Sequence, residues 1–302
     1  MQPQCLQRLL NSRKDPLLIQ GIFLSLGMIK RFHEAPKSIF KQVQQLTDGD
    51  YALVHLFEKD PEYLELFKKA VEEGREVILD NSVFELEKAF DPERFVYWIN
   101  ELNPTYYIVP DVLEDADGTI SNMAEWMGIW KEKVTADSKI IGVVQGEDYE
   151  SIKRCYMYMD AAGVDKIAIS FDYSYYRKSF PHPNRIISWS LGRVKLIEDL
   201  IDKGILNQNK PHHLLGCGTP GEGIFYNSPD YAFIDSVDTS SPVVHGLKHI
   251  LYDGPLGLTK KVSQKLCDLI DSDVDYIQWI SIKNNIREFQ RLWNGFYGVS
   301  EK

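Results

Sequence analysis

Short β-branched and aromatic runs alternate along this chain with windows of helical periodicity, and no other feature limits the possible folds as much. This alternation is typical of repeated β-α units around a parallel sheet. Seven runs are predicted to be strands: Tyr51–Phe57, Glu76–Asp80, Tyr106–Asp111, Lys139–Gln145, Lys166–Phe171, His212–Cys217 and Phe233–Asp238. An eighth strand is expected near Ile22–Leu26, a segment that could equally be helical. Eight units in roughly 250 residues predict a TIM-type (β/α)8 barrel.

The windows between the strands carry helix signals. Asp91 and Pro92 form an N-cap and a first-turn proline ahead of an apolar stripe. Similar stripes follow at 120–130 and 152–159, and we interpret all three as core positions. The periodic stretch Asp275–Trp293 is predicted to be a helix that closes the barrel or packs beneath it.

Composition excludes several classes of protein. The 302 residues are 44% hydrophobic and 26% charged, with a net charge of −10, which is ordinary for a globular enzyme. The acidic balance disfavours non-specific coating of nucleic acid but allows a local basic patch. No apolar run approaches the ~20 residues of a membrane helix, and the first residues lack signal-peptide features, so a cytoplasmic protein is expected. Without a linker, residues 1–302 are predicted to form one barrel domain.

The metal-ligating residue types do not form a recognisable motif. The four cysteines show no CxxC pair, and HxH and HExxH are absent. Neither a disulfide framework nor a metal site is therefore predicted. The residues considered are Cys5, Cys155, Cys217 and Cys267, with the histidine pairs His212-His213 and His245/His249.

Polar residues terminate several of the predicted strands. In a (β/α)8 barrel the carboxyl ends of the strands hold the active site, so these residues should converge. One such aspartate alone is usually a helix cap or turn residue, but several together suggest chemistry. Paired carboxylates fit cleavage at an anomeric carbon, and a metal-dependent lyase or hydrolase would use the same residue types. The strand-end residues are Asp80, Asp111, Gln145, Gly146, Ser170, Asp172, Asp235 and Asp238.

Four segments, in order, resemble motifs of the tRNA-guanine transglycosylase superfamily. Leu79–Leu86 (LDNSVFEL) resembles the family's DSGGFQ segment, and Gly142–Gly146 (GVVQG) its GIVQG strand. Leu214–Pro220 (LLGCGTP) resembles MGVGTP, and Ile234–Thr239 (IDSVDT) resembles FDCVLPT. The resemblance covers residues 76–246 and implies a pentosyltransferase that exchanges bases on a barrel of the predicted kind.

The resemblance also implies roles for individual residues. Asp235 would be the nucleophile at C1′ of a guanosine nucleotide, and Asp80 the general acid and base. The base would be held by Phe84, Asp111, Gln145, Gly146 and Leu215, with Phe84 stacking, Asp111 at the N1 and N2 edge, Gln145 at O6 and Leu215 on the other face. Double displacement at one carbon allows base exchange without ATP.

Departures from the family pattern bear on the substrate. Ser82 and Val83 replace two glycines, and the zinc motif CxCxxC with a distant histidine is missing. The basic residues that follow the nucleophile in tRNA enzymes are also missing. The chain therefore looks more like the phage-type DNA-guanine transglycosylases, which insert a queuosine-related 7-deazaguanine such as preQ0 into DNA with no cofactor or metal. A tRNA-guanine transglycosylase without the zinc module and a non-catalytic nucleic-acid-binding partner subunit are the alternatives.

One segment, Tyr173–Pro183, combines basic and aromatic residues without acidic ones. Such a loop at a strand end suits phosphate contact and base stacking. Tyr175, Tyr176, Arg177 and Lys178 are the residues expected to contact nucleic acid, and either tyrosine could fill the space left by a flipped base. A helix is expected to begin within 186–193.

Overall fold

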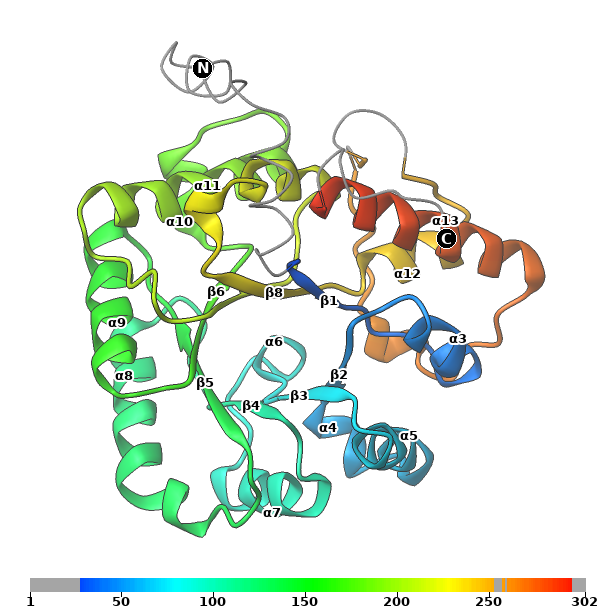
Figure 1. Ribbon diagram of the computed structural model, residues 1–302, viewed down its shortest axis with the longest axis horizontal. Coiled ribbons are helices and arrows are strands. Elements are labelled where there is room, and N and C mark those ends of the chain that lie inside the picture. The colour runs from blue at the N-terminus through cyan, green and yellow to red at the C-terminus, as the bar shows by residue number, and fades with distance from the viewer. Residues whose placement is uncertain (1–27, 253–256, 259, 295–302) are drawn as a thin grey trace.

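The computed structural model describes residues 28–252, 257–258 and 260–294. Eight parallel strands form a closed barrel in sequential order, β1 to β8, and β8 pairs with β1 to complete it. Figure 1 shows the strands as a ring with most helices outside it. The predicted (β/α)8 barrel is confirmed.

Each of the seven predicted runs contains or overlaps a strand. The strands are β1 Lys30–Phe32, β2 Gly49–Leu53, β3 Glu76–Asp80, β4 Tyr106–Ile108, β5 Lys139–Val144, β6 Lys166–Ser170, β7 His212–Leu215 and β8 Ile234–Asp238. One expectation needs correction, and one is not tested. The run Tyr51–Phe57 is a strand only to Leu53, because Val54–Phe57 turns into a helix. The expected strand at Ile22–Leu26 lies outside the described residues, and the three-residue β1 supplies the eighth strand.

The helices are α3 Phe40–Gln44, α4 Val54–Phe57, α5 Pro61–Glu72, α6 Val83–Leu86, α7 Pro92–Leu102, α8 Ala116–Glu125, α9 Tyr149–Ala161, α10 Ser174–Ser179, α11 Arg185–Asp202, α12 Ser241–Leu247 and α13 Tyr276–Trp293. The expected N-cap of α7 is present, since the Asp91 carboxylate accepts a hydrogen bond from the Arg94 N–H. A single π-helical turn, Trp126–Trp130, extends α8. None of the described helices is both long enough and apolar enough to cross a membrane.

The terminal helix α13 packs against α12 on the outside of the barrel (Figure 1). Ile282 and Ile286 of α13 join Val243 and Val244 of α12 in a small apolar cluster. Further along α13, Phe289 packs edge-on against the His33 ring, with ring centroids 5.1 Å apart, so the helix is tied to the segment that follows β1. The helix therefore packs on the outside of the barrel, against α12 and the segment after β1.

Buried histidines make the fold sensitive to acid. His212 is fully buried and stacks on Tyr156, whose hydroxyl lies 2.9 Å from Nε2, while Nδ1 lies 2.8 Å from the Lys210 carbonyl. Burial lowers the pKa of His212 to about 4, and it does the same for His33. The folded state therefore binds fewer protons than the unfolded chain between about pH 6.5 and pH 4.

We predict that stability falls as pH falls through this window, because the buried imidazoles must be protonated against their environment. The loss should be smaller in His212→Gln than in the wild type, as measured by the melting temperature at pH 7 and pH 5. The matched control is His182→Gln, since His182 is exposed. An unchanged pH dependence in His212→Gln would contradict this prediction.

Candidate active site

Asp235, the predicted nucleophile, lies at the amino-terminal end of the barrel. It is the second residue of β8 and sits at a β-bulge, where two β8 steps oppose one step of β7. Its carboxylate is 2.5 Å from the ammonium of Lys166, the first residue of β6. Lys166 in turn is 3.9 Å from Glu76, the first residue of β3, which pairs with Lys30 at 2.6 Å. These contacts form a charged cluster at the starts of the strands.

The charged cluster accounts for the ionisation of Asp235. Burial alone would raise the pKa of Asp235, but the Lys166 and Lys30 ammonium groups outweigh it, and the pKa lies below its ordinary value. Lys166 is completely buried, and its ammonium also lies 4.1 Å from the centre of the Tyr106 ring. Residues at this end of a (β/α)8 barrel usually serve stability. The structure does not bring Asp235 together with Asp80, because Asp80 ends β3 at the opposite end.

The carboxyl ends of the strands hold a second group of acidic side chains. Asp80 ends β3, Asp111 follows β4, Asp238 ends β8, and Glu34 and Glu85 lie in the segments after β1 and β3. Burial raises the pKa of Asp80 well above its ordinary value, and the charges of Glu85, Asp111 and Asp238 raise it further. Asp80 is therefore suited to hold a proton near neutral pH, as a general acid must.

Asp111 and Gln145 meet, as expected, at the carboxyl ends of the strands, which we call the barrel mouth. The Gln145 amide donates to Asp111 Oδ2 at 2.7 Å, and the Asn81 amide donates to Oδ1 at 2.9 Å. Burial raises the pKa of Asp111, while these two amides oppose the increase. The Gln145 Oε1 atom accepts the Glu114 N–H at 2.9 Å, so this side chain is held at both ends. The arrangement fixes the Asp111 carboxylate, and each oxygen has a further lone pair for a ligand.

Asp238 is a second carboxylate of the mouth that is held by two hydrogen-bond partners. Its Oδ1 atom lies 3.0 Å from His213 Nε2 and accepts the Gly216 N–H at 3.0 Å. His213 Nδ1 lies 2.9 Å from the Ser236 hydroxyl, which also accepts a hydrogen bond from Lys166 at 3.2 Å. Because a carboxylate can only accept, His213 donates from Nε2 to Asp238, and in the neutral imidazole Nδ1 then accepts the Ser236 hydroxyl proton. Burial lowers the pKa of His213, which is consistent with this neutral tautomer.

The glycines of the predicted motifs are required by close packing. A Cβ on Gly146 would lie 2.7 Å from the Ile152 backbone nitrogen at the start of α9. Gly216 has a φ of 62°, and a Cβ there would lie 2.4 Å from the Phe171 ring. Ser82, at a family glycine position, also adopts a left-handed φ of 61°, a conformation that costs a non-glycine residue on the order of 1 kcal/mol.

The two predicted base-covering residues lie at the rim. Phe84 belongs to α6 and is 43% exposed, with its ring centroid 6.5 Å from that of Phe171 and a tilt of 56°. Leu215 is the last residue of β7 and is partly buried. An exposed aromatic ring at the rim remains available for stacking.

The predicted nucleic-acid segment is not an open loop. Residues Ser174–Ser179 form the helix α10, and Tyr176 is completely buried, with its hydroxyl donating to the Ser170 carbonyl at 2.8 Å. Tyr176 is therefore a core residue, and its predicted contact with nucleic acid is wrong. Tyr175 is partly buried, whereas Arg177 and Lys178 are exposed and stay candidates for phosphate contact.

Sequence reasoning missed several residues of the mouth. Lys261 lies 3.8 Å from the centre of the Phe171 ring, and burial lowers its pKa to about 8 despite the nearby Cys217, Asp172 and Asp238. His213 was considered only as part of an unsupported pair. The strand alternation of β7 gave a usable signal, because it turns His213 inward and His212 outward. Lys261 lies in a segment without periodicity, and nothing in the sequence pointed to it.

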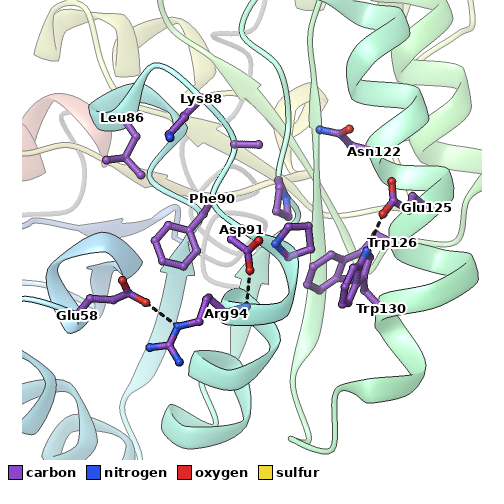
Figure 2. A pocket seen from close by; sticks show the side chains of 13 residues that line it. Glu58, Leu86, Lys88, Phe90, Asp91, Arg94, Asn122, Glu125, Trp126 and Trp130 are labelled. Carbon is purple, nitrogen blue, oxygen red and sulfur yellow. Dashed lines mark hydrogen bonds and ion pairs between the residues drawn. The ribbon is translucent and has the colours of Figure 1, made fainter.

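A cavity of about 530 Å³ lies beside the mouth, between the segment after β3 and α8. Figure 2 shows Phe90 on one side of it and Trp126 and Trp130 on the other. Pro110, which precedes Asp111, also lines it. None of the predicted catalytic or base-binding residues is among the residues that line this cavity, so it flanks the mouth and does not contain it.

Comparison with known proteins gives no assignment. No family model matches the chain, and no curated protein matches it. In the part of the chain that the structure describes, no group of three or more histidine, cysteine, aspartate or glutamate side chains could hold a metal ion. The proposed function therefore rests on the acidic residues, amides and histidine at the barrel mouth.

The location of Asp235 predicts a structural role. Asp235→Asn should lower the free energy of unfolding by on the order of 3 kcal/mol, because it leaves the buried Lys166 ammonium without its closest partner. Urea unfolding measures this change. As a control, Asp117→Asn removes an exposed ion pair with Arg154 and should cost under about 1 kcal/mol. Equal stability of Asp235→Asn and the wild type would contradict the structural role.

Proposed function

We propose that this protein is a base-exchange transglycosylase that replaces guanine in DNA by a 7-deazaguanine through an aspartyl-glycosyl intermediate. The observation that carries the proposal is a pair of differently supported carboxyl groups at the barrel mouth. Asp238 is held by His213 and Gly216, and Asp80 has a raised pKa. A carboxylate held by hydrogen bonds, beside a carboxyl group with a raised pKa, suits double displacement at an anomeric carbon.

The geometry changes the proposed nucleophile from Asp235 to Asp238. Both lie in the segment that resembles the family's FDCV motif, three residues apart. Asp238 reaches the carboxyl end of β8, whereas Asp235 is held by Lys166 at the other end. The Asp238 Oδ2 atom, which has no hydrogen bond from the described residues, is the oxygen available for attack.

In the proposed reaction, Asp238 attacks C1′ as the bond from C1′ to the guanine nitrogen breaks. Protonated Asp80 gives its proton to the leaving guanine and becomes a carboxylate. The incoming 7-deazaguanine then attacks C1′, the ester bond to Asp238 breaks, and Asp80 takes the proton from the incoming base. Configuration at C1′ is retained, and Asp80 is returned to its starting protonation state.

Asp111 supports guanine as the base. Its carboxylate can accept hydrogen bonds from the adjacent N1 and N2 donors of guanine, which adenine does not offer. Gln145 is committed to Asp111 and Glu114, so its proposed part is to orient Asp111 and not to contact O6. Phe84 at the rim is available to stack on the base.

The proposal predicts that purified protein incorporates radiolabelled guanine or preQ0 into DNA. Duplex DNA, single-stranded DNA and bulk tRNA should be tested in parallel by counting label in acid-insoluble polymer. Label in DNA alone supports the proposal, and label in tRNA alone would replace the DNA substrate by tRNA. Absence of label from all three polymers would count against base exchange, and loss of activity with EDTA would favour the metal-dependent alternative.

Variants of the mouth should separate the roles of the aspartates. Asp238→Asn should abolish both exchange and the covalent adduct with DNA, because the nucleophile is lost. Asp80→Asn should slow exchange by about 10²- to 10⁴-fold, because proton transfer to and from the base is lost. Asp235→Asn should retain exchange in the folded fraction. Full exchange by Asp238→Asn, or its loss in folded Asp235→Asn, would reject Asp238 as the nucleophile.

A further inference from the structure

A second cavity of about 660 Å³ lies on the same end of the barrel as Asp80. It is bounded by α4, by α6 and by residues 265–271. Glu85 lines this cavity and is also the carboxylate with the largest charge effect on Asp80. The backbone N–H of His55 donates at 3.3 Å to the hydroxyl of Ser82, which is two residues after Asp80 in the sequence. The cavity therefore adjoins the barrel mouth.

His55 is the buried polar side chain of this cavity. It is 7% exposed, and its Nδ1 atom is buried without a hydrogen-bond partner among the described residues. Burial, together with the charges of Lys59 and Lys265, lowers the pKa of His55 to about 4. A buried, unpaired ring nitrogen is costly unless a ligand or water satisfies it.

Two ammonium groups act on the His55 ring. Lys265 donates to the Phe84 carbonyl at 2.9 Å, which leaves it without a carboxylate partner in the described part of the chain. Lys59 is exposed and likewise forms no ion pair with a described residue. Lys37 differs, because it lines the same cavity but is neutralised by Asp60 and Asp271 at 2.6 and 2.7 Å. Lys59 and Lys265 are therefore the ammonium groups of the cavity wall that no described carboxylate pairs with.

Two acidic residues besides those paired with Lys37 need to be weighed, Glu85 and Asp268. Burial raises the pKa of Glu85, which favours its neutral form, and the Glu85 Oε2 atom is buried without a partner. Asp268 is an exposed carboxylate on the cavity wall, and Glu62 binds Lys37 from outside it. None of these carboxylates forms an ion pair with Lys59 or Lys265 within the described residues. An anion beside His55 would share a cavity with two ammonium groups that have no ion-pair partner among the described residues.

We propose that this cavity binds a backbone phosphate of the polynucleotide on which the barrel mouth acts, with His55, Lys59 and Lys265 as hydrogen-bond donors. The inference rests on the proposed function and adds to it the path of the nucleic-acid strand across the protein. A polynucleotide is favoured over free phosphate because the cavity adjoins Asp80 through Glu85 and Ser82. An acidic protein also needs local cations to hold a phosphate backbone.

The test is the binding of a fluorescein-labelled, guanine-containing single-stranded oligonucleotide, followed by anisotropy at several salt concentrations. Lys59→Gln and Lys265→Gln should each weaken binding about 3- to 10-fold and reduce the salt slope by about 0.7, the value for one lost phosphate contact on a single strand. The matched control is Lys69→Gln, an exposed lysine on α5, which should leave both quantities unchanged. Unchanged binding by both cavity variants overturns the inference.

Inorganic phosphate provides a second measurement on the wild-type protein. Nitrogen-15 spectra of the imidazoles should show that phosphate raises the pKa of His55 from about 4, since a bound anion favours the imidazolium. Exposed His182 is the internal control. If phosphate shifts His55 while the lysine variants bind the oligonucleotide normally, the cavity is a free-phosphate site and the strand assignment is overturned.

The failures of the two proposals can be distinguished. Lysine-dependent oligonucleotide binding without any base exchange would reject the transglycosylase function and retain the phosphate site. Base exchange that proceeds normally in both lysine variants, with unchanged affinity and salt slope, would reject only the phosphate site.

Discussion

A line of hydrogen bonds runs through the barrel from Lys166 at one end to Asp238 at the other. Lys166 donates to Ser236, Ser236 donates to His213, and His213 donates to Asp238. The Asp238 carboxylate only accepts, so a neutral His213 carries its proton on Nε2 and accepts the Ser236 proton at Nδ1. The line connects the mouth carboxylate with a buried lysine at the far end, where Asp235 balances the lysine charge.

This dependence divides the acidic residues of the barrel by function. At the amino-terminal end, the carboxylates of Asp235 and Glu76 are matched by Lys30 and Lys166, and their ionisation stabilises the fold. At the carboxyl end, carboxyl groups crowd together with few cations, and desolvation favours their protonated forms. Paired charges are typical of a structural cluster, whereas unpaired groups with raised pKa are typical of sites that transfer protons. The proposed chemistry uses only residues at the carboxyl ends of the strands.

The mouth is also asymmetric in a way that suits a polymer. Carboxyl groups line the centre, where the reacting base would lie, and lysines with no acidic partner in the described structure lie at the margin near His55. Under the proposed function, a polyanion would be held at the margin while one nucleotide enters the acidic centre. Net charge therefore says little about nucleic-acid binding here, because the relevant charges are separated in space.

The sequence by itself determined the barrel, because strand-forming runs alternate with amphipathic windows. It also determined that Asp80, Asp111 and Gln145 would lie at one end of the barrel, because each ends a predicted parallel strand. Asp235 and Asp238 flank Ser236 and Val237, and a bulge in β8, which no local pattern predicts, lies at Asp235, whose carboxylate pairs with Lys166. Tertiary structure alone placed the two aspartates at opposite ends of β8. It likewise decided that Tyr176 is core, because burial depends on what α11 and β6 place around it. Ion pairing and burial depend on residues that are far apart in the sequence, so local periodicity cannot determine them.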